Sequence, residues 1–181
     1  GVGRGGYLVA RLGMMRALVV GAFAGPLSNL AFAWLAFQGP ELWALFVAIG
    51  IDNIAGGVSG TCLIAYMSSL TSAGFTATQY ALFSSLYALP GKLIASQSGR
   101  IVESSAAAAD AGGVLAGLKA LFLRLPPEAY ATAMEKSQVT PPALGAGYVM
   151  FFVYSAVIGV AAVILAFVVA AKQAALGPAK D

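Results

Sequence analysis

The sequence predicts an all-α fold made of membrane-spanning helices. Hydrophobic residues form 60% of the 181-residue chain and charged residues only 9%, whereas about a quarter of the residues in a soluble domain are charged. Apolar runs of about twenty residues recur along the chain, which is the length a helix needs to cross the hydrocarbon layer. We therefore expect a polytopic helical membrane protein with about four transmembrane helices in a single domain, residues 1–181.

The predicted spans follow one another with turns between them. The first sixteen residues are rich in glycine and are expected to form a short turn. Gly25-Pro26 lies inside the first apolar run and predicts a kink, because proline removes one backbone hydrogen bond. Gly39-Pro40 predicts a tight turn that pairs the first two spans as a hairpin. The expected spans are residues 17–37, 42–70, 79–101 and 148–171.

The segment of residues 104–147 is predicted to lie outside the membrane as a long loop. Val114, Leu118 and Leu121 recur at helical spacing within it, which indicates a short amphipathic helix at the membrane interface. A second short helix is expected over residues 128–136. Two interpretations of the whole segment stay open, namely a lid and a loose connection without a special role.

Asp52 is the strongest candidate functional residue. It lies about ten residues inside the second apolar run, and an ionised side chain at that depth costs about 3 kcal/mol on insertion scales. Such residues persist with a polar partner or a water-filled cavity, and they often mark pathways. The structural alternative is that Asp52 only caps or hydrogen-bonds a neighbouring helix.

Small residues surround this acid on the same helix. Helical spacing places Asp52, Gly56 and Gly60 on one face, and Asn53, Gly57 and Gly60 on the adjoining face. Helices in a membrane associate where small residues let their backbones approach. We therefore predict that Gly56, Gly57 and Gly60 pack against other helices, so that Asp52 and Asn53 face protein or a cavity.

Lys92 is a second charge inside an apolar run, within the third predicted span. It lies close enough to the end of that span for its ammonium group to reach the membrane surface. A role in a pathway or in packing remains the alternative.

The composition argues against several classes of function. The chain has no histidine and one cysteine, so the commonest general base and metal ligand is missing, and neither a disulfide nor a zinc framework is expected. We expect no enzyme activity and no cofactor. The net charge of +3 is spread along the chain, so a nucleic-acid partner is not expected either.

Several segments resemble a known family. Gly6 to Arg16 resembles the loop motif that recurs in the major facilitator superfamily. The stretches Asp52 to Gly57, Tyr66 to Leu70 and Phe75 to Ser85 are similar to the bacterial muropeptide permeases of the AmpG type. The resemblance covers Gly3 to about Glu103.

The chain departs from the family pattern at two places. Ala10 stands where the superfamily loop usually has an aspartate, which puts the charge relay of that loop in doubt. Residues 104–147 exceed the short turn expected before a final helix, so no family role carries over to them.

The resemblance implies a proton-coupled secondary transporter of the bacterial inner membrane. It would import anhydro-muropeptides for cell-wall recycling by alternating access, and the four spans would match helices nine to twelve of a twelve-helix fold. The chain would then be a C-terminal piece, whose partners are the bilayer, the missing N-terminal helices and the substrate. Within that fold, Asp52, Asn53, Gln79 and Lys92 would line the substrate or proton pathway.

Two other functions stay open at this point. One is a permease of the same superfamily for another cargo, such as acetyl-CoA or a small solute. The other is a non-transporting four-helix membrane protein that assists assembly. Four spans would place both termini on one side, and a slight excess of lysine and arginine there predicts that this side is cytoplasmic.

Overall fold

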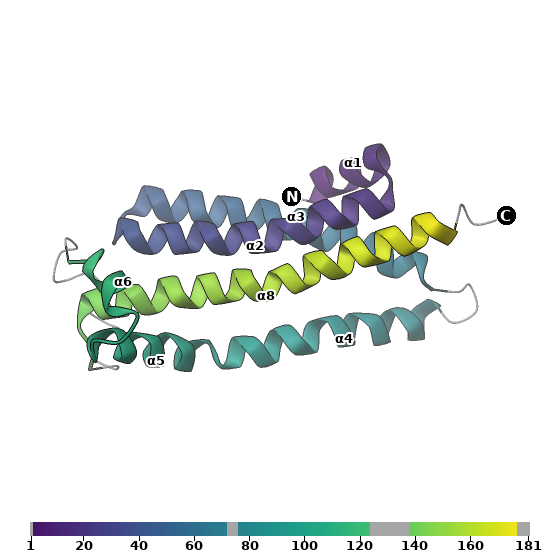
Figure 1. The fold of residues 1–181 in the computed structure, drawn as a ribbon. Coiled ribbons are helices and arrows are strands. Elements are labelled where there is room, and N and C mark those ends of the chain that lie inside the picture. Colours follow the sequence, from purple (N-terminus) through teal and green to yellow (C-terminus); the bar gives the residue numbers. More distant parts are fainter. Residues whose placement is uncertain (1, 72–75, 124–137, 177–181) are drawn as a thin grey trace. The chain divides into compact units, whose positions relative to one another are not determined.

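The computed structural model describes residues 2–71, 76–123 and 138–176. Over these residues every regular element is a helix (Figure 1). The predicted all-α class is therefore confirmed. The described helices are α1 (Val2–Leu12), α2 (Met14–Gln38), α3 (Leu42–Ser69), α4 (Thr76–Ser96), α5 (Ser98–Asp110), α6 (Ala116–Ala120) and α8 (Pro141–Leu176).

Three of the described helices are long and apolar enough to cross a membrane. They correspond to Met14–Gln38, Leu42–Ser69 and Pro141–Ala175. Helix α4 has 21 residues, which is long enough, but it does not join these three because Lys92 and several hydroxyl and amide side chains lower its hydropathy. The polytopic character is thus confirmed with three candidate spans, where about four were predicted.

The first two spans lie close to their predicted bounds. Helix α2 extends the first span by three residues at its start and one at its end, and α3 ends one residue before the expected limit. Helix α2 continues through Pro26. The Ser28 hydroxyl donates a 2.9 Å hydrogen bond to the Gly25 carbonyl, which gives this carbonyl a partner beside the proline.

The N-terminal segment differs from its prediction as a glycine-rich turn. Residues 2–12 form the helix α1, and Gly13, with a φ of 79°, separates it from α2. Leu8 and Val9 on α1 pack against a buried cluster, and this burial outweighs the low helix propensity of the glycines. The cluster consists of Ala17, Val58 and Cys62.

The third predicted span is not one continuous helix. Helix α4 ends at Ser96, and α5 begins at Ser98 after a turn at Gln97. Helix α5 continues to Asp110, so the first part of the predicted loop 104–147 is helical. The expected amphipathic helix is present only as the five residues of α6. The second short helix, predicted over 128–136, lies outside the described residues.

Helix α8 begins seven residues before the predicted start of the last span and ends five residues after its predicted end. Pro141 and Pro142 were interpreted as part of a loop. Proline is well suited to the first turn of a helix, because the N–H groups there have no partner within the helix. Thr140 accepts a 3.0 Å backbone hydrogen bond from Leu144 and so begins the helix.

The chain divides into two compact units, and α2, α3, α4 and α8 each contribute to both. The first unit comprises residues 1–28, 50–89 and 156–181. Its helices approach each other at glycines. A Cβ on Gly159 would lie 2.6 Å from Cγ of Pro26, so α8 packs directly on the proline ring of α2. Phe23 and Phe167 add an edge-to-face ring contact between these two helices at 6.0 Å.

The second unit comprises residues 29–49 and 90–155. Its core contains Phe122, which is fully buried and stacks on Phe37 with ring centroids 4.8 Å apart. Glycines again allow close packing. A Cβ on Gly145 would lie 2.6 Å from the Phe122 ring, and one on Gly147 would lie 2.6 Å from the Val102 carbonyl. The start of α8 is therefore pressed against α5 and the segment after α6.

A polar cluster joins three elements of this second unit. Asp110, the last residue of α5, accepts a 2.5 Å ion-pair hydrogen bond from Lys119 of α6. The backbone N–H of Thr140 donates to the same carboxylate at 2.8 Å, and the Thr140 hydroxyl donates at 2.6 Å. The cluster thus fixes the end of α5 to the start of α8.

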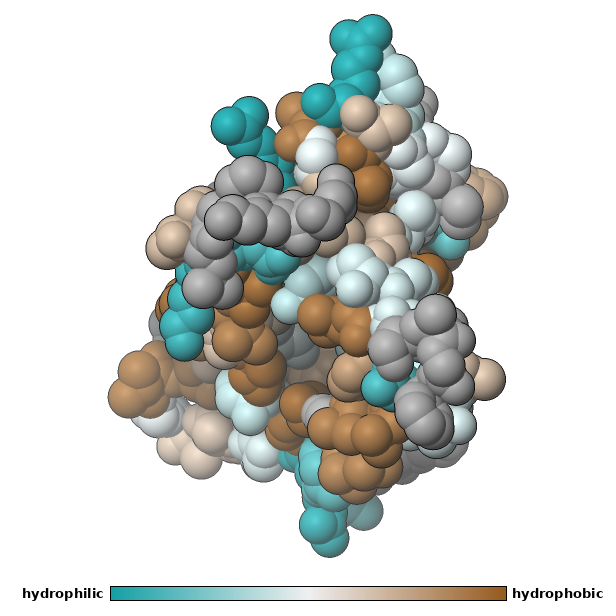
Figure 2. All heavy atoms as spheres, turned by 90° about the vertical axis from the view of Figure 1, so that its right-hand side faces the viewer, coloured by the Kyte–Doolittle hydropathy of each residue, from teal (hydrophilic) through white to brown (hydrophobic). Residues whose placement is uncertain are grey.

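Large apolar side chains are exposed along the candidate spans. Leu42 and Phe46 on α3 are exposed by 70% and 73%, and Leu165 on α8 by 63%. Figure 2 shows apolar side chains, coloured brown, at the surface among polar ones in teal. A water-soluble protein seldom exposes apolar surface this widely, whereas helices solvated by lipid do so as a rule.

Candidate functional site

Helix α3 presents the predicted acid on an open face. Asp52 and Asn53 lie in the first half of this helix, and both are exposed. With the side chains that the structure describes in its unit, Asp52 forms no ion pair. The face around it stays accessible to solvent, a substrate or further protein.

The glycines of this face do not pack tightly against the described chain. A Cβ on Gly56 or Gly60 would meet no other atom within 4 Å, and Gly57 is half-buried. The first unit makes its close approaches at other glycines. The role of Gly56, Gly57 and Gly60 in helix packing therefore stays a prediction, and at Gly56 and Gly60 it would need groups beyond the described residues.

The hydroxyl groups nearby are occupied by their own helix. The Ser59 hydroxyl donates to the Gly56 carbonyl at 3.3 Å, and the Thr61 hydroxyl donates to the Gly57 carbonyl at 2.7 Å. Such bonds satisfy the donors locally. Neither of these two hydroxyl groups therefore donates to Asp52.

The two remaining candidates lie on α4. Gln79 is half-buried in the first unit, and Lys92 is exposed in the second unit. Asp52, Asn53 and Gln79 thus belong to one unit. Lys92 belongs to the other, so its predicted place in the same pathway stays a prediction. Its exposure fits the interpretation that its ammonium group reaches the membrane surface.

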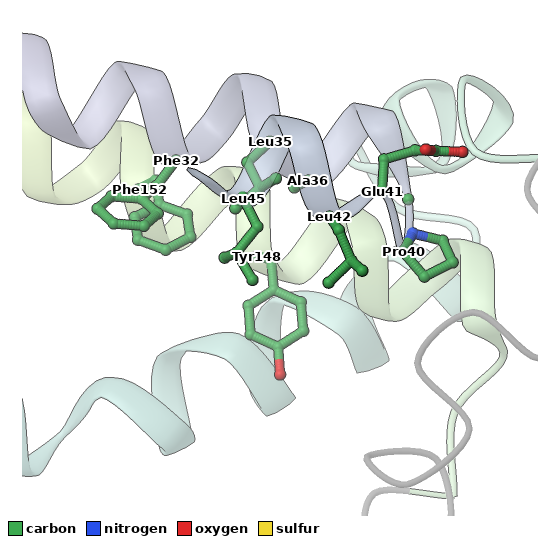
Figure 3. A pocket seen from close by; sticks show the side chains of 10 residues that line it. Phe32, Leu35, Ala36, Pro40, Glu41, Leu42, Leu45, Tyr148 and Phe152 are labelled. Carbon is green, nitrogen blue, oxygen red and sulfur yellow. The ribbon is translucent and has the colours of Figure 1, made fainter. Parts of the chain in front are cut away.

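The second unit contains a groove that the sequence did not indicate. Its volume is about 450 Å³, and it lies beside the turn between α2 and α3 (Figure 3). Among the described residues that line it, Glu41 is the one charged residue, and none of the four predicted pathway residues is present. The lining residues are Phe32, Leu35, Ala36, Gly39, Pro40, Glu41, Leu42, Leu45, Tyr148 and Phe152.

The sequence contained partial signals for the groove and for the polar cluster. Tyr148 and Phe152 line the groove from the first part of α8. Both lie within the span that was predicted over residues 148–171. Thr140 directly before Pro141 matches the residue preferences at the start of a helix, and that signal would have placed the start of α8 beside Thr140. Over the described ranges, His, Cys, Asp and Glu residues nowhere form a group of three that would hold a metal ion.

About half of the chain is similar to proteins named as transporters. A protein named "Putative transporter AmpG 4" from Rickettsia conorii is 36% identical over 98 residues, which cover 54% of this chain and 24% of that protein. "Putative transporter AmpG 3" from Rickettsia prowazekii is 35% identical over 95 residues, covering 52% of this chain and 23% of that protein. "Putative transporter AmpG 1" from Rickettsia bellii is 32% identical over 98 residues.

The other two comparisons gave no relatives. No family model matches the chain, and no solved structure matches it. The chain spans about a quarter of the length of the curated relatives that it matches. Its similarity is therefore to a part of larger, AmpG-named transporters, as the sequence motifs implied.

Proposed function

We propose that the chain forms part of a secondary active transporter of the bacterial inner membrane. It would import anhydro-muropeptides for cell-wall recycling, coupled to protons, by alternating access. The observation that carries this proposal is the similarity over about half of the chain to AmpG-named transporters. Three helices long and apolar enough to cross a membrane support it.

Asp52 is assigned the role of the acid that faces the transport cavity. In this role it would bind a proton on one side of the membrane and release it on the other. It could equally accept hydrogen bonds from amide and hydroxyl groups of the substrate. Its exposure on the Gly56 face of α3 supports this role.

The other polar candidates complete the proposed pathway. Asn53 and Gln79 would hydrogen-bond polar groups of the cargo, and Lys92 would meet a carboxylate of the substrate or pair with Asp52. Gly56, Gly57 and Gly60 would let α3 slide against helices elsewhere in the full-length protein. Both termini of this chain are assigned to the cytoplasmic side, which requires α4 to cross the membrane as a fourth span.

Uptake of radiolabelled anhydro-muropeptide by the full-length protein tests the proposal. Cells without another importer would carry either the natural protein or the Asp52→Asn variant, which keeps the shape of the side chain but not its charge. We expect Asp52→Asn to reduce uptake by about tenfold or more, as for loss of a proton-transferring group, and to flatten its dependence on external pH.

The matched control is Glu103→Gln, because Glu103 is exposed on α5 and outside the three candidate spans. Unchanged uptake and unchanged pH dependence in Asp52→Asn would refute the coupling role. Competition by acetyl-CoA instead of muropeptide would identify a different cargo. No uptake of either compound by a correctly inserted protein would favour the assembly role.

A further inference from the structure

The groove of the second unit is lined mainly by apolar side chains. Phe32 and Leu35 of α2, Leu45 of α3 and Phe152 of α8 contribute large apolar side chains. Figure 3 shows Phe32, Leu45 and Phe152 on neighbouring helices around the same space. Phe32 and Phe152 stack with ring centroids 5.2 Å apart and so hold one wall in place. An apolar ligand would be the natural occupant of such a space.

The groove lies where two candidate spans reach the membrane surface. One span ends at Gln38 and the next begins at Leu42, so the turn between them lies at the boundary between hydrocarbon and water. Trp34 and Trp43 pack edge to face beside this turn, with ring centroids 5.6 Å apart. Tryptophan concentrates at membrane interfaces, which supports this placement of the turn.

The one charged residue among the described lining residues lies at this interfacial end. Glu41 is exposed next to Pro40, directly before the first residue of α3 (Figure 3). The cation of α6, Lys119, is engaged by Asp110. A ligand whose apolar tail fills the groove would therefore place its polar end near a carboxylate, which attracts an ammonium group and repels an anionic one.

The walls of the groove favour a hydrocarbon chain over a helix. Large side chains dominate these walls, whereas helices in membranes usually meet at small residues. A thin, flexible acyl chain can pack between large side chains without such a close approach of backbones.

We propose that this groove binds one acyl chain of a phosphatidylethanolamine molecule, with the lipid ammonium group next to Glu41. The lipid would fill the space between α2, α3 and α8 at the membrane surface. Phosphatidylglycerol, which carries a net negative charge and no ammonium group, would bind less well.

Native mass spectrometry of the full-length protein tests this proposal. The protein would be released from vesicles containing equal amounts of phosphatidylethanolamine and phosphatidylglycerol, and the retained lipid would be identified. We expect retention of phosphatidylethanolamine. Leu45→Trp should abolish this retention by filling the groove, while Glu41→Gln should lower the preference over phosphatidylglycerol by about two- to fivefold, the effect of one exposed charge pair.

Matched variants show whether a change in lipid retention comes from the groove or from a general effect of the substitution on the protein. Phe46 is 73% exposed on the same helix but does not line the groove, so Phe46→Trp should behave like the natural protein. Glu103→Gln is the corresponding control for the loss of one negative charge. Equal retention of the two lipids by the natural protein, or unchanged retention in Leu45→Trp, would overturn the proposal.

A photoreactive phosphatidylethanolamine provides an independent readout that does not depend on any variant. Its acyl-chain label should attach to peptides that contain Phe32 to Leu45 or Tyr148 to Phe152. Attachment only to other peptides would overturn the proposal. Cross-linking of Leu42→Cys to another segment of the full-length protein would identify a protein occupant instead of a lipid. The uptake assay for Asp52 is independent of these measurements, so either proposal can fail alone.

Discussion

At the residue scale, the Asp110 carboxylate is held by an unusually complete set of donors. Its partial burial opposes ionisation, but the hydrogen bonds from Lys119 and Thr140, together with the positive charge of Lys119, outweigh that effect and lower the pKa of Asp110 to about 2. A lowered pKa in the folded state means that the ionised carboxylate stabilises the fold. This cluster therefore couples the stability of the second unit to pH.

The sign of this coupling gives the first prediction. In the unfolded chain the carboxyl group ionises near its ordinary value of 3.8, so the stabilisation is complete above about pH 4 and is lost as the pH falls towards 2. Asp110→Asn should lower the free energy of unfolding by about 1–2 kcal/mol at pH 7, allowing for screening by water at a side chain about a quarter exposed.

Thermal unfolding of the detergent-solubilised full-length protein measures this effect. The difference between Asp110→Asn and the natural protein should shrink as the pH is lowered from 4 to 2. Glu103→Gln alters an exposed acid of the same helix. It should unfold at nearly the same temperature as the natural protein at every pH. If Asp110→Asn were less stable than the natural protein by the same amount at every pH, the charge of Asp110 would contribute nothing to stability.

Single residues also show what the sequence could reveal about the site. Asp52 could be singled out because a carboxylate inside an apolar run is costly wherever the helix packs. Asp110 could not be singled out in this way, because its importance depends on Thr140. The two residues are thirty positions apart in the sequence and meet only when α5 and α8 come together. Contacts of this kind have no local signature.

At the scale of elements, the start of α8 depends on the absence of a side chain at Gly147. A Cβ there would lie 2.6 Å from the Val102 carbonyl, and a backbone atom cannot move aside as a flexible side chain can. Gly147→Ala should therefore push α8 away from α5 and lower the free energy of unfolding by about 1–3 kcal/mol.

Gly99→Ala is the matched control for this second prediction. Gly99 is exposed on α5, and a Cβ there would meet no atom within 4 Å. Alanine should be neutral or stabilise the helix by up to about 1 kcal/mol. Thermal unfolding compares the two variants, and equal stability of both would contradict the close approach at Gly147.

Gly56 and Gly60 give a third prediction, because their face of α3 is open in the described chain. If helices elsewhere in the full-length protein pack there, Gly56→Leu or Gly60→Leu should abolish transport by holding those helices apart. Ile54→Phe is the control, since Ile54 is also exposed but lies two residues, and so about half a turn, away from Gly56 on α3. Normal uptake in both test variants would rule out packing at this face.

Helix boundaries show which elements the sequence could predict. Helix α3 was placed to within one residue because a turn with glycine and proline precedes a long apolar run. Helix α1 was not predicted, since its glycines resemble a loop and only the packing of Leu8 and Val9 makes it helical. The start of α8 was missed because proline can end one helix and begin another.

At the scale of the whole molecule, the membrane character followed directly from composition. Apolar residues that cannot all be buried must be solvated by lipid, and long helices are the structure that satisfies the backbone there. The number of spans was harder to predict. Helix α4 has the length of a span but carries a lysine and many hydroxyl groups, so its hydropathy alone does not place it across the bilayer.

The central claim is that Asp52 faces a water-filled transport passage. The most direct test is thiol labelling in the full-length protein, with Cys62 replaced by serine and a single cysteine introduced by Asp52→Cys or, as control, Ile54→Cys on another face of α3. A charged, membrane-impermeant reagent should label Asp52→Cys much faster than Ile54→Cys, and added muropeptide should slow that reaction. Equal or slower labelling of Asp52→Cys would contradict the claim.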